Sequence, residues 1–227
     1  SMHLIDQRVG FMGTTAIVGN SIPVGVGLGL SIKLDGDDRI SCIFLGDGCI
    51  EEGVFYESAN FSVVKNLPVL FICENNLYSV YSPLSVRQPN GRKIHEVAEA
   101  IGLKAYHEEG ANVESSYNEV NSAIEHVRSG FGPAFVEISA YRWREHCGPN
   151  FDNHLSYRSE KEFLEWKERD PLNCYEKTLL ESKELDEVNL KKIEQQIFAE
   201  VNEAFEYAQE SKFPDIREAY TNEYFDN

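Results

Sequence analysis

The chain has 227 residues, with 21 Lys and Arg against 38 Asp and Glu, so its formal net charge at pH 7 is −17. Nucleic acids and anionic membrane surfaces repel so acidic a protein, and we expect neither as a partner. Apolar residues make up 42% of the chain, which excludes wholesale disorder. The five cysteines form no CxxC pair, which favours a reducing, cytoplasmic compartment over a disulfide framework.

Along the chain, short apolar runs alternate with segments of helical spacing. Strands are predicted at residues 40–45, 67–73, 104–107 and 134–138, and helices at 21–34, 51–64, 94–101 and 113–127. Runs that are apolar on both faces, separated by helices, are typical of a parallel sheet that is covered on both sides. We therefore predict an α/β fold with a mainly parallel sheet and helices on both faces.

After residue 140 the pattern changes. Residues 141–157 mix charged, polar and aromatic side chains and are predicted to form a long functional loop. Ser159 and Glu162 have the spacing of a capping box, which predicts a helix that begins near Glu160. The Asp-Pro dipeptide at 170–171 is predicted to end this helix.

The last part of the chain is predicted to be helical. A long helix is expected to begin near Asp186, with one apolar stripe that packs into a core. The stripe consists of Leu190, Ile193, Ile197, Val201, Ala204, Phe205 and Ala208. We expect two parts, an α/β domain over residues 1–158 and a C-terminal helical extension over residues 159–227.

Two polar motifs directly follow two of the predicted strands. Gly46-Asp47-Gly48 comes after the strand at 40–45, and Asn75-Asn76 comes after the strand at 67–73. One helix and one strand fill the segment between the motifs. Both motifs should therefore lie at the carboxyl ends of adjacent parallel strands, where open α/β sheets bind ligands.

The residue types in these motifs suit a metal-bound diphosphate. Asp47 offers a carboxylate oxygen and Asn76 an amide oxygen, both suited to Mg²⁺, which usually completes its coordination with phosphate oxygens. Gly46 and Gly48 allow backbone N–H groups to approach the phosphates closely. Each motif alone is also a common turn, but the two together at this separation predict a diphosphate–Mg²⁺ site.

A glycine-rich segment offers a weaker alternative. Gly25, Gly27 and Gly29 give the pattern GxGxG rather than GxGxxG, and they follow a proline rather than a strand. This spacing argues against a dinucleotide site. We expect Gly25 and Gly29 to allow close packing of a helix, either in the core or at a subunit interface.

The amino-acid sequence around the motifs resembles that of a known family. SMHL, AIVGNSIPVGVG, GDGCIEEGVFYESANF, LPVLFICENNLYS and YRWREH are similar to the alpha subunit of the decarboxylating component of 2-oxo acid dehydrogenase complexes, in the pyruvate and acetoin branches. The resemblance is strong over residues 1–158 and weak beyond them. It implies a thiamine diphosphate-binding fold, with thiamine diphosphate and Mg²⁺ as cofactors. It also implies oxidative decarboxylation of a 2-oxo acid such as pyruvate, or the analogous cleavage of acetoin.

The resemblance also implies roles for single residues. Asp47 and Asn76 match the side-chain ligands of Mg²⁺, and Tyr78 matches a ligand that acts through its backbone carbonyl. The positions that match diphosphate contacts are Gly46, Gly48 and Cys49, and those that match the lining of the aminopyrimidine ring are Ala16 and Val18.

A loop histidine carries the implied catalytic role. His146 matches a residue that touches the diphosphate and faces the substrate. The loop reads Arg-Glu-His-Cys over residues 144–147, where family members often have His-Gly-His-Ser. The serine of that motif is a phosphorylation switch in some members, so Cys147 implies that the switch is absent here.

The resemblance further implies partners. Family alpha chains are about half as long again, so the chain is expected to lack their N-terminal part. The glutamate that activates the aminopyrimidine belongs to the beta subunit, which implies a beta chain in an α₂β₂ heterotetramer and, in complexes, a lipoyl acyltransferase. Two alternatives stay open. One is a stand-alone two-chain enzyme that makes another acyl or carboligation product, and the other is a non-catalytic remnant that only dimerises.

Overall fold

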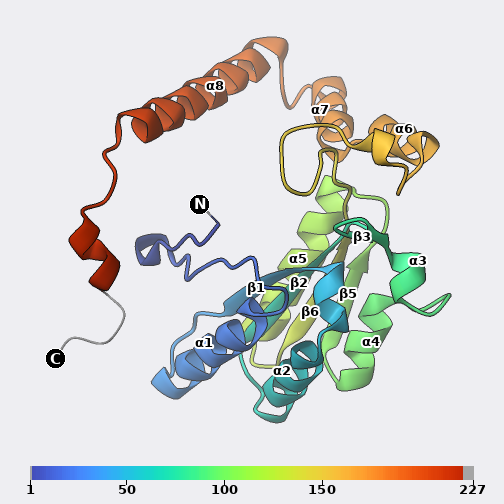
Figure 1. Ribbon diagram of the computed structural model, residues 1–227. Coiled ribbons are helices and arrows are strands. Elements are labelled where there is room, and N and C mark those ends of the chain that lie inside the picture. Colours follow the sequence, from blue (N-terminus) through green and yellow to red (C-terminus); the bar gives the residue numbers. More distant parts are fainter. Residues whose placement is uncertain (1, 222–227) are drawn as a thin grey trace. The chain divides into compact units, whose positions relative to one another are not determined.

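The computed structural model describes residues 2–221 and contains a four-stranded, wholly parallel sheet in the order β1-β2-β6-β5 (Figure 1). The strands are β1 Ser41–Gly46, β2 Val69–Asn75, β5 Lys104–Glu108 and β6 Ala134–Ser139. The strand predictions are confirmed to within two residues at every boundary. The prediction of an α/β fold built on a mainly parallel sheet is confirmed with them.

Helices cover both faces of this sheet. The helices that share a core with the sheet on one face are α1 Ser21–Asp35, α2 Gly53–Val64 and α4 Ile94–Ile101. Helix α5, Val113–Arg128, packs on the other face. Strand β2 sends Phe71 to the first face and Leu70 to the second, and both side chains are fully buried. Its continuous apolar run therefore reflects a strand that is covered on both sides.

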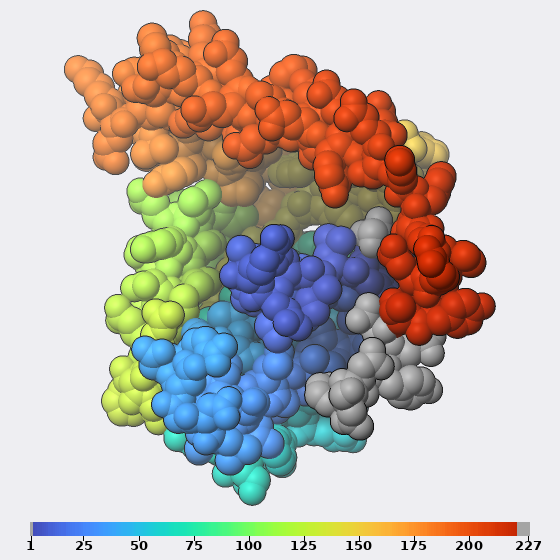
Figure 2. All heavy atoms as spheres, turned by 90° about the vertical axis from the view of Figure 1, so that its left-hand side faces the viewer, coloured from blue at the N-terminus to red at the C-terminus, as the bar shows by residue number. Residues whose placement is uncertain are grey.

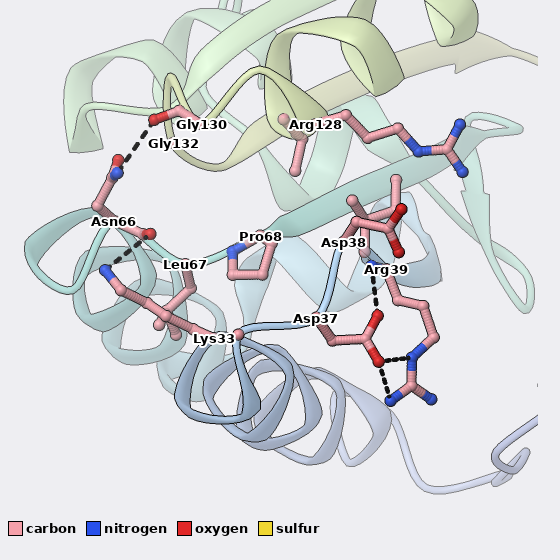
Figure 3. Close-up of a pocket in the computed structure, with 13 residues that line it drawn as sticks. Lys33, Asp37, Asp38, Arg39, Asn66, Leu67, Pro68, Arg128, Gly130 and Gly132 are labelled. Atoms are coloured by element: carbon pink, nitrogen blue, oxygen red, sulfur yellow. Dashed lines mark hydrogen bonds and ion pairs between the residues drawn. The ribbon is translucent and has the colours of Figure 1, made fainter.

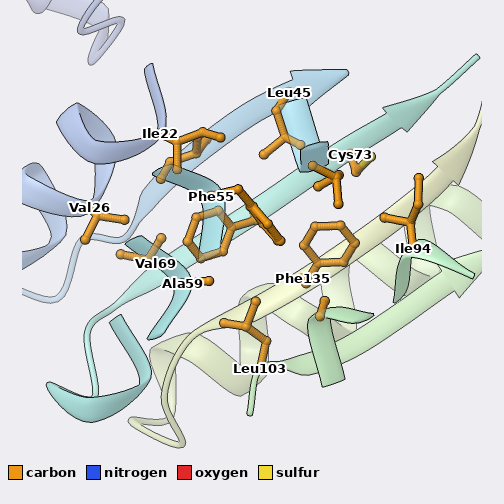
Figure 4. Packing of buried hydrophobic residues seen from close by; sticks show 14 of the residues in the cluster. Ile22, Val26, Leu45, Phe55, Ala59, Val69, Cys73, Ile94, Leu103 and Phe135 are labelled. Carbon is orange, nitrogen blue, oxygen red and sulfur yellow. The ribbon is translucent and has the colours of Figure 1, made fainter. Parts of the chain in front are cut away.

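Aromatic rings fill the centre of the larger core (Figure 4). Phe55 of α2 lies edge-on to Phe71 of β2 and Phe135 of β6, with ring centroids 6.1 and 6.0 Å apart. Edge-to-face pairs of this kind contribute about 0.5–1.5 kcal/mol beyond their buried area. They fix α2 over the middle of the sheet, and the segment that precedes α2 is thereby held at the sheet edge.

Two glycines bring α1 into close contact with the sheet. A β-carbon at Gly25 would clash with the Ile43 side chain of β1, and one at Gly29 would clash with the Val69 side chain of β2, each at 2.4 Å. The interpretation of these glycines as helix-packing positions in the core is therefore confirmed.

The register of β1 and β2 sets the geometry of the carboxyl edge. Gly46, the last residue of β1, pairs with Glu74 of β2. The chain continues from β1 into a 3-10 turn, η2 Asp47–Glu51, and α2 begins at Gly53, two residues after the predicted helix start at residue 51. Asp47 and the Asn75-Asn76 pair therefore leave the sheet side by side.

A small hairpin follows the asparagine pair. Strands β3 Tyr78–Ser79 and β4 Ser82–Pro83 pair antiparallel and lead into a short helix, α3 Leu84–Arg87. These elements were not predicted. Residues 2–20 contain the 3-10 turn η1 Gln7–Val9, and this segment lies on the surface next to α1 (Figure 2, dark blue beside lighter blue).

Helices dominate the chain after β6. The loop that follows β6 contains the 3-10 turn η3 Asn153–Leu155. The later elements are α6 Glu160–Glu168, α7 Pro171–Ser182, α8 Glu187–Glu210 and the 3-10 turn η4 Ile216–Tyr220. Chain contacts separate a compact unit that ends at Tyr175 from a second unit that begins at Glu176. Among the described helices, none combines the length and apolarity that a bilayer crossing requires.

The long helix α8 corrects one prediction. Its start is confirmed, because the Asp186 side chain caps it by accepting a hydrogen bond from the backbone N–H of Asn189. The expectation that its apolar stripe packs into a core is wrong, because Ile197 and Phe205 are more than half exposed and no residue of α8 is buried. An apolar stripe is buried only where a second apolar surface covers it, and within the second unit the described residues bury none of this stripe.

Candidate functional site

Asp47 is a buried carboxylate at the carboxyl edge of the sheet. It follows the last residue of β1, and its side chain is only 1% exposed. Arg87, the last residue of α3, donates from Nη2 to Asp47 Oδ2 and from Nη1 to Glu51 Oε1 at 2.6 Å. A buried carboxylate is tolerated only where a cation or several donors compensate its charge. In this site the Arg87 guanidinium compensates the charge of Asp47.

The turn that carries Asp47 is packed against hairpin β3–β4. A β-carbon at Gly48 would lie 2.7 Å from Ser79 Oγ and 3.8 Å from Arg87 Nη1. Only glycine fits there without a shift of the hairpin. The Gly-Asp-Gly motif therefore meets the segment that follows Asn76, and the two motifs are brought together as the sequence predicts.

The asparagine pair forms two successive side-chain turns. Asn75 Oδ1 accepts a hydrogen bond from the backbone N–H of Leu77, and Asn76 Oδ1 accepts one from that of Tyr78, both at 3.0 Å. Asparagine side chains favour this contact with the backbone two residues on. Leu77 is forced into the left-handed region with φ +70°. Asn76 Oδ1 keeps a second lone pair for another partner.

Glu137 of β6, the strand next to β2, anchors this asparagine turn. Its Oε1 accepts a hydrogen bond from Asn75 Nδ2 at 2.8 Å, and its Oε2 accepts one from the backbone N–H of His95 at 2.9 Å. The His95 ring nitrogen Nδ1 is 2.7 Å from the same oxygen. The rings of His95 and His107 stack with centroids 4.1 Å apart. Glu137 thus joins β6 and α4 to the end of β2.

Tyr78 is held in place at both ends. Its ring is buried, and its hydroxyl donates to the Glu162 carboxylate of α6 at 2.8 Å. Burial, and then the hydrogen bond to Glu162, raise the pKa of Tyr78 well above its usual value. The phenol therefore stays protonated, and the contact fixes the backbone of Tyr78 beside the asparagine turn.

The loop between β6 and α6 is built around a buried ion pair. Arg158 Nη2 donates to Asp152 Oδ1 at 2.6 Å, and both side chains are 1% exposed. The Tyr157 hydroxyl donates to Asp152 Oδ2 at 2.7 Å and accepts from Arg142 Nη2 at 2.8 Å. Burial opposes ionisation of Asp152, but the hydrogen bond from Tyr157 and the charge of Arg158 outweigh it and lower the pKa.

His146 lies in the exposed tip of this loop. Its Nδ1 is 3.4 Å from Arg142 Nη1, and Arg142 Nη2 also donates to the backbone carbonyl of Val80 at 2.9 Å. The rings of Tyr157 and Tyr78 lie edge to face with centroids 5.3 Å apart. Two contacts therefore tie the loop of His146 to the hairpin that follows Asn76.

The remaining predicted residues lie at the surface. Ala16 and Val18 are exposed and belong to the segment before α1. A β-carbon at the next residue, Gly19, would lie 3.1 Å from the Val54 side chain. The segment of Ala16 and Val18 therefore lies near the start of α2. At the Asp47 turn, Gly46 is exposed and Cys49 is half-buried. The ligand roles of all these residues stay predictions.

A separate cavity of about 310 Å³ lies at the opposite end of the sheet (Figure 3). Its lining includes Asp37, Arg39 and Arg128, close to the start of β1 and the end of α5. Lys33 reaches across to the backbone carbonyl of Lys65 at 2.6 Å and so caps the end of α2. This cavity is remote from both motifs, so it forms no part of the candidate site.

The donors at the carboxyl edge fit a hard divalent cation. Asp47 would supply a buried carboxylate, Asn76 an amide oxygen with a free lone pair, and Tyr78 its backbone carbonyl. Among residues 2–221, no group of three or more His, Cys, Asp or Glu side chains is placed to hold a metal ion. A metal at this edge therefore depends on neutral oxygen donors, which suit Mg²⁺ when phosphate oxygens complete its shell.

The sequence pattern did not reveal the residues that support this site. Arg87 reaches Asp47 across 40 positions of the chain, and Glu137 reaches Asn75 across 62. Arg87 follows no motif, and Glu137 sits in a strand that reads as apolar. A charged residue inside an apolar strand was the one available signal for Glu137, because such a residue needs a buried partner.

Comparison with protein families matches residues 1–217 to the dehydrogenase E1 component family. The chain is 38% identical over 224 residues to the pyruvate dehydrogenase E1 component subunit alpha of Rickettsia felis, which covers 99% of this chain and 68% of that protein. The protein of the same name in Rickettsia bellii is 37% identical with the same coverage. That of Rhizobium meliloti is 31% identical over 98% of this chain and 63% of its own length.

Proposed function

Because this chain belongs to the dehydrogenase E1 component family, we propose that it is the alpha subunit of a thiamine diphosphate-dependent dehydrogenase acting on a 2-oxo acid such as pyruvate. The relatives' names support the reaction class. One observation carries the assignment to this site: a buried carboxylate, Asp47, leaves the sheet beside an asparagine turn. That arrangement suits a metal-bound diphosphate.

Each part of the proposed cofactor site has its own residues. Asp47, Asn76 and the backbone carbonyl of Tyr78 would hold Mg²⁺. The diphosphate would lie against the turn of Gly46, Gly48 and Cys49, whose first backbone N–H groups lack partners within the turn. When bound, thiamine diphosphate supplies the electron sink for loss of CO₂. Ala16 and Val18 would line the aminopyrimidine ring, on the side of the site where Gly19 packs on α2.

His146 would act at the substrate side of this site. The loop is fastened to the hairpin by Arg142, so a histidine at its tip can be carried over the diphosphate turn. A donor or cation placed there would stabilise negative charge on the substrate. Arg142 Nη1, 3.4 Å from His146 Nδ1, would hold the ring in position at the tip of the loop.

A beta subunit completes the proposed enzyme. The nearest glutamate of the turn, Glu51, is already paired with Arg87 and Gln88, so it is a poor candidate for activating the aminopyrimidine. We propose that the glutamate that activates the aminopyrimidine comes from a beta chain in an α₂β₂ assembly. The alpha subunit would be inactive without that beta chain. We also propose that a lipoyl acyltransferase accepts the acyl group and that the enzyme is cytoplasmic. Residues 1–158 would form the cofactor-binding part.

The Asp47→Asn variant tests the cofactor site. It removes the charge but keeps the shape of the buried side chain, so Mg²⁺-dependent binding of thiamine diphosphate should weaken at least about tenfold, or 1.4 kcal/mol. Isothermal titration calorimetry with thiamine diphosphate and Mg²⁺ measures this. Asp37→Asn is the matched control, because Asp37 pairs with Arg39 at the opposite end of the sheet. Equal affinities in the two folded variants would exclude the proposed metal ligand.

A further inference from the structure

Arg87 is held in an almost closed pocket beside the proposed metal site. Its side chain is 9% exposed. Besides the contact of Nη2 with Asp47, its Nη1 reaches Glu51 Oε1 at 2.6 Å and its Nε donates to the backbone carbonyl of Ser82 at 3.0 Å. All three nitrogens of the guanidinium are thus engaged. A planar fork held at three points is a specific contact and not a chance surface ion pair.

The Asp47 carboxylate cannot bind Arg87 and a divalent metal ion equally tightly at the same time. Its Oδ2 accepts from Arg87, and the whole side chain is buried. Two like charges a few ångströms apart in a buried site repel each other strongly, because the local dielectric constant is low. A divalent cation on Asp47, even one bound through Oδ1, is therefore repelled by the guanidinium and weakens its contact with Oδ2.

A displaced guanidinium has a second partner close by. Glu51 is 28% exposed and already accepts from Arg87 Nη1 and from Gln88 Nε2 at 3.0 Å. Arg87 can therefore rotate away from Asp47 and stay neutralised by Glu51. The position of Arg87 at the end of the four-residue helix α3 makes such a small shift possible without moving the sheet.

We propose, on the basis of the proposed function, that Arg87 is a built-in counter-ion that competes with the metal for Asp47. Without metal, Arg87 keeps the buried carboxylate neutralised and the edge of the sheet folded. Metal loading replaces this ion pair, so the affinity for the metal is lower than the oxygen donors alone would give. Arg87 thereby sets the metal concentration at which the cofactor site fills.

Metal titration of an Arg87→Gln variant tests this competition. Mn²⁺ binding followed by electron paramagnetic resonance, at a fixed excess of thiamine diphosphate, should give a dissociation constant at least about tenfold lower than in the unchanged chain. Arg92→Gln is the matched control, because Arg92 lies five positions further on, is exposed, and donates from Nη1 to Gln88 Oε1 at 3.2 Å. The control should leave metal affinity unchanged.

Thermal unfolding gives a second readout that does not depend on activity. Loss of Arg87 leaves Asp47 buried and unpaired, which lowers the melting temperature of the metal-free variant. Because the metal then binds more tightly, added Mg²⁺ and thiamine diphosphate should raise that temperature more than in the unchanged chain. Arg87→Lys keeps one charge but cannot make three contacts, so it should fold well and show an intermediate metal affinity.

The outcomes separate this inference from the proposed function. Loss of metal binding in Asp47→Asn, together with unchanged or weaker binding in Arg87→Gln and Arg87→Lys, would overturn the competition and leave the metal site standing. Weaker binding would point to a direct contact between Arg87 and the diphosphate. Retained metal binding in Asp47→Asn would instead overturn the metal site itself.

Discussion

At the scale of single residues, the site depends on charges that are buried and compensated. Asp47 has Arg87, Asp152 has Arg158, and Glu137 has two side chains and a backbone N–H. Removing one partner of such a contact leaves the other desolvated, which costs more than the contact itself contributes. These positions should therefore tolerate substitution far less than the exposed charges of the same chain.

Glu137→Gln should destabilise the fold by about 1–3 kcal/mol. Glutamine has one acceptor oxygen where the carboxylate has two, so either Asn75 or the backbone N–H of His95 loses its acceptor. Urea unfolding measures the change in the free energy of unfolding. Glu109→Gln is the control, because Glu109 is exposed and its Oε1 contacts the ring of His107 at 3.0 Å. Similar stability of the two variants would contradict the anchoring role of Glu137.

At the scale of elements, the loop after β6 is a unit with its own core. The aromatic rings of Tyr141, Trp143, Phe163 and Trp166 pack together, and Tyr141 stacks on Trp166 with centroids 5.1 Å apart. The Asp152–Arg158 pair closes the loop beside them. The chain has only two tryptophans, and both belong to this cluster. Tryptophan fluorescence therefore reports on this loop and on α6.

Acid should open this loop through Asp152. Its pKa is lowered in the folded state, so the stabilisation is complete above the pKa of an unfolded aspartate, about 3.9. It is lost as the pH falls through the lower, folded value. Tryptophan fluorescence followed from pH 6 downward should show a transition that Asp152→Asn lacks. The same transition in both proteins would assign the acid sensitivity to other groups.

Local signals in the sequence were enough to predict most elements. The strands follow from apolar runs, and α6 and α8 begin where Ser159 and Asp186 cap them. The prediction that Asp170-Pro171 ends α6 is confirmed, but the start of α7 at the same proline was not predicted, although proline is favoured in the first turn of a helix. The hairpin strands β3 and β4 span two residues each, too short for any pattern.

The site could be predicted only as far as its motifs reach. Asp47 and Asn76 stand out because glycine and asparagine neighbours mark the turns at the ends of two strands. Arg87 and Glu137 could not be predicted, since tertiary folding alone brings them to these turns. The exposed stripe of α8 was misjudged for the related reason that periodicity shows an apolar face but not what covers it.

At the scale of the whole molecule, this chain alone should not turn over substrate. The proposed activating glutamate lies in a beta chain, and substrate binding without activation does not lower the barrier of the chemical step. Decarboxylation of pyruvate with an artificial electron acceptor should therefore be absent for the purified chain, and should appear when a full alpha chain is combined with a beta chain. Rates for the isolated chain close to those of the pair would contradict the assignment of the activating glutamate to a beta chain.

The parallel pairing of β1 with β2 has a kinetic consequence. The two halves of the site meet only when these strands, joined through helix α2, are in register. Pairings between distant segments form slowly during folding, so the unfolded chain and early folding states offer the metal and the diphosphate nothing to bind. A ligand that recognises only the finished edge slows escape from the native state and leaves the rate of reaching it unchanged. In stopped-flow experiments, Mg²⁺ with thiamine diphosphate should therefore lower the unfolding rate at each denaturant concentration. The refolding rates should stay unchanged.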